Sequence, residues 1–169
     1  MTPAVVLLRS WAEGDVSLLE RLVGDPAMTR YIGGPETGIR IRRRHQRYLA
    51  TNHRPDGRMY VIVVGEERVA AGSVGYWEHD WHRETVWEVG WSVLPEFQGQ
   101  GIATAATRLV VAETRANRRH RCVHAFPAVE NLASNAICRK AGFTLIGPCH
   151  IEYPPGHMLR SNDWETDLT

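Results

Sequence analysis

Residues 86–116 constrain the fold of this chain more than any other stretch. Residues 85–93 alternate between a mostly apolar set and a smaller, more polar one, which predicts a β-strand. Pro95 cannot donate a hydrogen bond to a sheet, so this strand must end near Leu94. A glycine-rich loop follows, and residues 102–115 place apolar side chains at helical spacing. The sequence therefore predicts a strand, a glycine-rich loop and a helix that meet at one turn.

The loop that links this strand to this helix indicates an anion site. Its glycines let the backbone turn its N–H groups outward, and they leave no Cβ in the way of a ligand. The first turn of a helix offers unpaired N–H groups and the positive end of a dipole. We therefore interpret the loop as a pyrophosphate site made by Gln98, Gly99, Gln100, Gly101, Ile102 and Ala103. The alternative is a helix start whose glycines only make a tight turn.

Two motifs in this chain resemble those of the GNAT N-acetyltransferase superfamily. Gln98, Gly101 and Ala103 fill the fixed positions of its Gln/Arg-x-x-Gly-x-Gly/Ala motif, which follows a strand that ends in Val-x-Pro. About 30 residues downstream, the run NLASNAICRKAGF at residues 131–143 resembles its second motif, Asn-x-x-Ser followed by Lys-x-Gly-Phe. The resemblance extends over roughly residues 5–168 and is closest to the branch that acetylates the N-termini of ribosomal proteins.

The resemblance implies an α/β (α+β) fold with a mixed, mostly antiparallel sheet of about six to seven strands. It also implies helices on both faces and a central parallel strand pair that splays apart. The length of 169 residues favours a single domain over residues 1–169. The residue pattern itself predicts strands at 5–9, 59–64, 69–77, 85–93, 122–126, 144–153 and 158–168. It predicts helices at 15–23, 28–32, 39–52, 102–115 and 131–141.

The resemblance further implies that acetyl-CoA is the co-substrate. It would lie where strands 85–93 and 122–126 separate, and its pantetheine arm would pair with the backbone of Trp91, Ser92 and Val93. Asn131 matches a position that hydrogen-bonds the pantetheine. As an alternative or additional role, Asn131 is a good N-cap for the following helix.

The implied reaction is acetyl transfer to a primary amine by direct attack in a ternary complex. Amines are mostly protonated at neutral pH, so a base is needed, and Glu88 on the polar face of its strand is the candidate. The alternative for Glu88 is a structural carboxylate paired with Arg or His. We expect the Val93 N–H to stabilise the oxyanion.

The proton donor for the departing thiolate is less well defined. Many family members have Tyr at the position of Cys138, so we favour Ser134 as the general acid and leave Cys138 and water open. This departure also leaves a second function open, a non-catalytic acyl-CoA-binding sensor.

The sequence does not distinguish a protein N-terminus from a small-molecule amine as the acceptor of the acetyl group. Loops near residues 25–50, 78–84 and 150–160 would form its site, with Trp81 and His82 as candidate contacts. The arginine-rich run at residues 40–47 has two interpretations. We favour a solvated helix face, with Ile39, Tyr48 and Leu49 buried, over a surface that binds RNA or an acidic acceptor.

Composition limits which partners, cellular compartment and metals we expect for this chain. Twenty Lys and Arg balance nineteen Asp and Glu, so nothing favours a nucleic acid or a membrane surface as partner. Three cysteines without a Cys-x-x-Cys spacing predict reduced thiols, no disulfide and a cytoplasmic protein. His79, Asp80 and His82 form only a weak metal pattern, and we expect no metal. A homodimer remains open.

Overall fold

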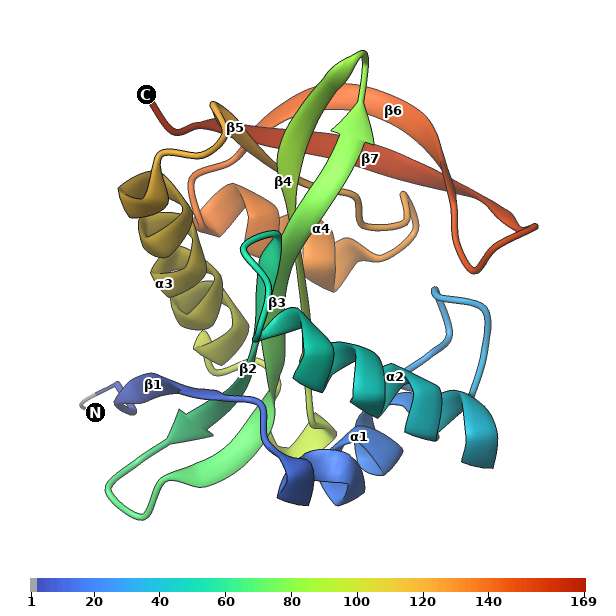
Figure 1. Ribbon diagram of the computed structural model, residues 1–169, viewed down its shortest axis with the longest axis vertical. Helices are drawn as coiled ribbons and strands as arrows, with labels where there is room; N and C mark the ends of the chain where they lie inside the picture. The colour runs from blue at the N-terminus through green and yellow to red at the C-terminus, as the bar shows by residue number, and fades with distance from the viewer. Residues whose placement is uncertain (1–2) are drawn as a thin grey trace.

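The computed structural model describes residues 3–169 and contains a sheet flanked by helices (Figure 1). The strands are β1 (Val6–Ser10), β2 (Gly57–Val64), β3 (Val69–Trp81), β4 (Glu84–Val93), β5 (Cys122–Ala125), β6 (Thr144–Glu152) and β7 (Met158–Asp167). The helices are α1 (Val16–Val23), α2 (Gly38–Thr51), α3 (Ile102–Asn117) and α4 (Leu132–Lys140), with short 3₁₀ turns η1 (Glu13–Asp15) and η2 (Pro95–Phe97). No helix within residues 3–169 is long and apolar enough to span a membrane.

The seven strands are hydrogen-bonded in the order β1-β2-β3-β4-β5-β7-β6. Each neighbouring pair is antiparallel except β4 and β5, which run parallel in the middle of the sheet. Parallel strands cannot be joined by a tight turn, and α3 provides the crossover between them. The predicted fold class, a mixed and mostly antiparallel sheet with one central parallel pair, is confirmed.

Two apolar clusters lie on opposite faces of the sheet. On β2, Ile62 and Val64 belong to one cluster, whereas Val61 and Val63 belong to the other. Helices α3 and α4 contribute to the first cluster, and α1 and α2 contribute to the second (Figure 1). The run of residues 59–64 in β2 has no charged residue, which is typical of burial on both faces. The central strands are therefore held between two layers of helices.

The predicted helix at residues 28–32 is wrong, because this segment forms turns. The carboxylate of Asp25 accepts a hydrogen bond from the Ala27 N–H at 2.7 Å, and the Thr29 hydroxyl donates to the Asp25 carbonyl at 2.8 Å. An Asp side chain that captures backbone N–H groups two residues on favours a turn over a helix.

Helix α2 buries only part of the predicted stripe, because Tyr48 and Leu49 are half-buried against the core but Ile39 is not. Ile39 is 54% exposed, and the buried positions are Ile41 and His45, one helical turn apart. The Trp11 indole N–H donates to His45 Nδ1 at 3.0 Å, which fixes this face of the helix against the core. Most of the arginine run does lie on the exposed face, as predicted, but Arg44 is half-buried and forms an ion pair with Glu36.

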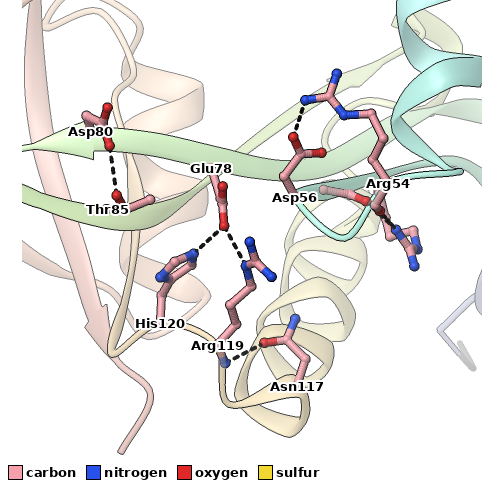
Figure 2. Close-up of polar contacts among 10 residues, drawn as sticks. Arg54, Asp56, Glu78, Asp80, Thr85, Asn117, Arg119 and His120 are labelled. Carbon is pink, nitrogen blue, oxygen red and sulfur yellow. Dashed lines mark hydrogen bonds and ion pairs between the residues drawn. The ribbon is translucent and has the colours of Figure 1, made fainter.

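The segment 78–84, predicted as a loop, instead continues strands β3 and β4 to a tight hairpin. The turn is His82-Arg83, and both residues have positive φ, at 48° and 68°. Turns of this kind usually carry Asn or Gly, so the sequence gives little sign of this one. Figure 2 shows the hairpin held by a hydrogen bond from the Thr85 hydroxyl to Asp80 and by Glu78, which pairs with Arg119 and His120.

Candidate active site

The parallel pairing of β4 and β5 is short. It joins Trp87 to Val123 and Glu88 to His124, after which β5 ends at Ala125 while β4 continues to Val93. Residues 89–93 therefore present a strand edge that is not paired with β5. A peptide-like ligand can add to such an edge by backbone hydrogen bonds. The predicted separation of the central strands is present.

The register of β3 and β4 decides which backbone groups face this open edge. The Leu94 N–H donates to the Ala71 carbonyl at 2.8 Å, and hydrogen-bonded pairs alternate along an antiparallel ladder. The backbone of Ser92 therefore turns to β3. By the same alternation, the N–H groups of Trp91 and Val93 turn to the opening. Two of the three residues predicted to meet the pantetheine arm can thus do so through their backbone.

The glycine-rich loop follows directly at the end of β4 through η2. Gly99 and Gly101 have φ of 72° and 76°, a left-handed conformation that favours glycine. The side chains of Gln98 and Gln100 fold back and donate to the Val93 and Glu96 carbonyls, at 2.8 and 3.0 Å. The glutamines therefore hold the loop to the strand end, and the loop's own backbone stays exposed.

Helix α3 begins at this loop with Gly101 as its N-cap. Its first main-chain bond joins the Ala105 N–H to the Gly101 carbonyl, so the N–H groups of residues 102–104 have no acceptor in the helix. The side chains of Ile102 and Ala103 are buried in the core below. These two residues would therefore bind a ligand through their backbone N–H groups. Free N–H groups, a helix dipole and open space suit a pyrophosphate.

Glu88 lies on β4 with its side chain 18% exposed. Its carboxylate accepts from the Trp77 indole N–H at 3.1 Å and lies 3.0 Å from His79 Nδ1 on β3. The hydrogen bond to Glu88 raises the pKa of His79, although burial opposes the shift. Glu88 thus has the histidine partner that the structural alternative predicted. A carboxylate joined to an imidazole is also an arrangement that can take up and pass on a proton.

The second motif forms the start of α4. The Asn131 side chain accepts a hydrogen bond from the Ser134 N–H at 3.1 Å, so Asn131 is the N-cap of this helix. Its oxygen is occupied in the cap, which leaves the amide NH₂ as the group that can meet a ligand. Ser134 lies in the first turn and is half-buried.

Cys138, one of the alternatives for the general acid, lies in the core. Its side chain is fully buried among Ala106, Phe143 and their neighbours, and burial raises its pKa to about 12. The thiol packs as a small apolar group there. Of the residues that the sequence left open, Ser134 is the one near the surface.

Two depressions lie where acceptor contacts were predicted. The first has a volume of about 360 Å³ and contains both candidate contacts, Trp81 and His82; it is lined by Trp81, His82, Ile146, Gly147, Pro148, Cys149, His150 and Asp163. The second, of about 540 Å³, adjoins the end of β4 and is lined by Glu20, Arg21, Gly24, Asp25, Pro26, Leu94, Pro95 and Glu96. Each contains at least one carboxylate that can attract an amine, Asp163 in the first and Glu20, Asp25 and Glu96 in the second.

Sequence reasoning missed Asn135, which links α4 to β7. It is buried, it accepts from the Trp164 indole N–H and the Asn162 amide, and it donates to the Ala128 carbonyl at 3.0 Å. Sequence reasoning also missed His124, which is buried between two carboxylates of β7. An asparagine in the middle of a helix is a weak sign of such a role. The histidine had no sequence signal, because its partners lie about forty residues away.

Comparison with known proteins agrees with this geometry. The sequence profile of the acetyltransferase (GNAT) domain matches residues 6–144. No curated protein matches the chain in sequence.

Similar solved structures include a Salmonella typhimurium acetyltransferase that modifies the N-terminal serine of ribosomal protein L7/L12. It is 22% identical with a TM-score of 0.79, and the match covers 97% of this chain and 95% of that one. A Vibrio cholerae spermidine N-acetyltransferase in complex with CoA and spermine is 19% identical with a TM-score of 0.77, over 96% and 95%. An aminoglycoside acetyltransferase in complex with coenzyme A is 18% identical with a TM-score of 0.77, also over 96% and 95%. At these identities the structures show a common fold.

Proposed function

The chain belongs to the acetyltransferase (GNAT) family, and on this premise we propose that it transfers an acetyl group from acetyl-CoA to a primary amine. The observation that carries the proposal is the open edge of β4 next to the glycine-rich start of α3. The open edge of β4 can pair with the amide-containing arm of a ligand, and the start of α3 can bind the phosphates of the same ligand. Few ligands besides a coenzyme A thioester combine these two features.

What is known of the similar structures supports both substrates. The Vibrio cholerae enzyme and the aminoglycoside acetyltransferase are solved with coenzyme A. The acceptors in their descriptions, together with that of the Salmonella protein, are a polyamine, an aminoglycoside and a protein N-terminus. Each offers a primary amine. We therefore propose that this chain also uses acetyl-CoA and an amine acceptor. The acceptor is either a protein N-terminus or a small-molecule amine.

We assign the cofactor contacts in order along the chain. The N–H groups of residues 99–103 would bind the pyrophosphate, with Gly99 and Gly101 giving it access. Gln98, which the sequence included in this site, takes no direct part, because its N–H donates to the Pro95 carbonyl at 3.2 Å. An arm that starts at this loop would first meet the backbone of Val93 and then that of Trp91. The amide of Asn131 would contact the arm from α4. The backbone of Ser92 takes no part, because it bonds to β3.

This order along the strand favours the Trp91 N–H as the oxyanion donor, in place of the Val93 N–H expected from the sequence. Trp91 lies three positions after Glu88, which is roughly 10 Å along a strand. From Val93 the distance would be roughly 16 Å. Glu88 therefore would act as a base through one or two waters, and His79 beside it would receive or return the proton.

Once the amine has attacked, the tetrahedral intermediate expels the thiolate of coenzyme A. Ser134 in the first turn of α4, or a water beside it, would supply the proton, because Cys138 is enclosed in the core. The amine nucleophile loses one proton and the thiolate gains one, so the acetyl transfer balances without any further reactant.

The test is to incubate the protein with acetyl-CoA and a panel of amines, and to follow both thiol release and the mass of the acetylated product. Glu88→Gln should lower kcat by about 100-fold or more, as expected for loss of a general base, with little change in coenzyme A affinity. Glu78→Gln is the matched control. It lies on the same hairpin but pairs with Arg119 and His120 (Figure 2), and it should leave turnover unchanged.

Saturable coenzyme A binding without turnover on any amine would point instead to the acyl-CoA sensor. The buried position of Cys138, where many relatives carry Tyr, is the observation that keeps this second function in view. Normal turnover and an unchanged pH profile in Glu88→Gln would remove Glu88 from the mechanism.

A further inference from the structure

A histidine on β5 lies between two carboxylates of β7. His124 Nδ1 is 2.6 Å from Asp163 Oδ1, and His124 Nε2 is 3.2 Å from Glu165 Oε2. Both His124 and Asp163 are almost completely buried, with side chains 5% exposed. Cys122 is two residues before His124 on the same strand, and so on the same face of the sheet. The thiol, the imidazole and the Glu165 carboxylate lie within 4.8 Å of one another.

The hydrogen bond to Asp163 determines which nitrogen of His124 is free. A carboxylate only accepts hydrogen bonds, so Nδ1 must carry the proton that it shares with Asp163. The Trp81 indole N–H donates to the other oxygen of Asp163 at 3.0 Å, which holds this carboxylate in place. In the neutral imidazole, Nε2 then has a lone pair that faces a carboxylate oxygen. Two acceptors at 3.2 Å repel each other unless a proton or a cation lies between them.

We propose that Cys122, His124 and Glu165 bind a zinc-class divalent cation, with Asp163 orienting the histidine from behind. Thiolate, imidazole and carboxylate together are a zinc ligand set, whereas magnesium and calcium prefer oxygen alone. A carboxylate on the second nitrogen of a metal-binding histidine is a common supporting contact. Three protein ligands leave the fourth position of the tetrahedron to water.

The spacing of the ligand atoms is close to what zinc requires. Ligand bonds of about 2.0–2.3 Å place tetrahedral ligands roughly 3.3–3.6 Å apart. Nε2 and Oε2 are 3.2 Å apart, about 0.1 Å below this range. The thiol lies within 4.8 Å of both of these atoms, and it loses its proton on binding. Glu165 is 36% exposed and Cys122 is half-buried, so the ion can enter from solvent.

The position of this site indicates a structural role for the metal, which would cross-link β5 and β7. His124 is paired with Glu88 at the last point where β4 and β5 are joined. A metal that ties β5 to β7 would hold β5 where it separates from β4. The inference departs from the expectation of a metal-free protein, and it does not depend on the proposed acetyl transfer.

The experiment uses tag-free, reduced protein that has been stripped with a chelator and titrated with Co²⁺ as a spectroscopic probe. We expect a near-ultraviolet thiolate-to-cobalt charge-transfer band and intense visible bands of tetrahedral cobalt, saturating at one ion per chain and displaced by Zn²⁺. Cys122→Ser should abolish the charge-transfer band. Asp163→Asn should weaken binding by about 10- to 100-fold.

Cys149→Ser is the matched control, because Cys149 is also half-buried but lies on β6 outside the cluster. It should keep every cobalt band. Circular dichroism of each variant shows whether it is folded, and Glu165→Gln, which changes the most exposed ligand, should weaken cobalt binding at least tenfold. Absence of the bands in the native protein would overturn the proposal and favour a protonated His124 between the carboxylates. Bands that persist in Cys122→Ser, or vanish in Cys149→Ser, would overturn it as well.

Discussion

The ion pair between His79 and Glu88 makes the stability of the fold depend on pH. Because Glu88 raises the pKa of His79 in the folded protein, the pair stabilises the fold most below the unfolded value of about 6.5. This stability is lost as the pH rises through the higher folded pKa. His79→Gln should therefore lower the melting temperature most at pH near 6, by the equivalent of about 1 kcal/mol, and progressively less in more alkaline buffers.

Thermal melts at several pH values measure this difference, and the exposed His53 provides the control. His53→Gln should melt like the native protein throughout. A gap between His79→Gln and native protein that stays constant with pH would show that the histidine acts by packing alone.

Asn135 is the second residue whose role depends on its exact partners. Asn135→Ala would leave the indole N–H of Trp164 and the amide of Asn162 without their acceptor in a largely buried site. Unsatisfied buried groups cost about 1–3 kcal/mol each, so we expect a loss of roughly 2–4 kcal/mol in the free energy of unfolding. Leu132→Ala on the same helix, where the side chain is 79% exposed, should change it by less than about 0.5 kcal/mol. Equal effects in denaturant melts would contradict the assignment.

At the scale of elements, the sequence was most informative where local chemistry decides the structure. The strand–loop–helix unit of β4 and α3 could be predicted because alternation, a proline and two glycines all act over neighbouring residues. The His82-Arg83 turn could not, because strand pairing imposed positive φ on residues that do not favour it. The partners of His124 could not either, because β7 reaches β5 only after β6 has formed the outer edge of the sheet.

The loop between β4 and α3 gives a prediction in which strain and binding can be separated. Gly101 and Gly65 have nearly the same backbone, with φ of 76° and 74°, and a Cβ at either would meet open space. Alanine at either position should cost about 1–2 kcal/mol of stability, because left-handed φ strains it. Only Gly101→Ala should also weaken coenzyme A binding, by tenfold or more, since its Cβ would stand where the pyrophosphate approaches.

Calorimetric titration with coenzyme A and thermal melts distinguish these two effects. Gly65→Ala, in the turn between β2 and β3, measures the strain alone. If both variants bound coenzyme A as the native protein does, the loop would be only a tight turn, which is the alternative that the sequence left open.

For the whole molecule, the open edge in the middle of the sheet implies that the cofactor completes the fold. Strands β4 and β5 share two residue pairs, so the two halves of the sheet are joined weakly at their centre. A ligand that pairs with β4 and anchors at α3 and α4 would bridge this gap. At one hundred times its dissociation constant it should stabilise the native state by about 2.7 kcal/mol, which is roughly 5–10 °C for a chain of this size.

Melts with coenzyme A, with pantetheine and with 3′,5′-ADP separate the contributions of the two parts. Pantetheine lacks the pyrophosphate, and 3′,5′-ADP lacks the arm and keeps only the 5′-phosphate of the pyrophosphate, so each should give a smaller shift than the intact cofactor at equal concentration. Hydrogen exchange should slow at the N–H groups of Trp91 and Val93 on binding, because these face the opening, and stay constant at Ser92, which already bonds to β3. Protection at Ser92 without change at Trp91 and Val93 would mean that the cofactor does not lie along this edge.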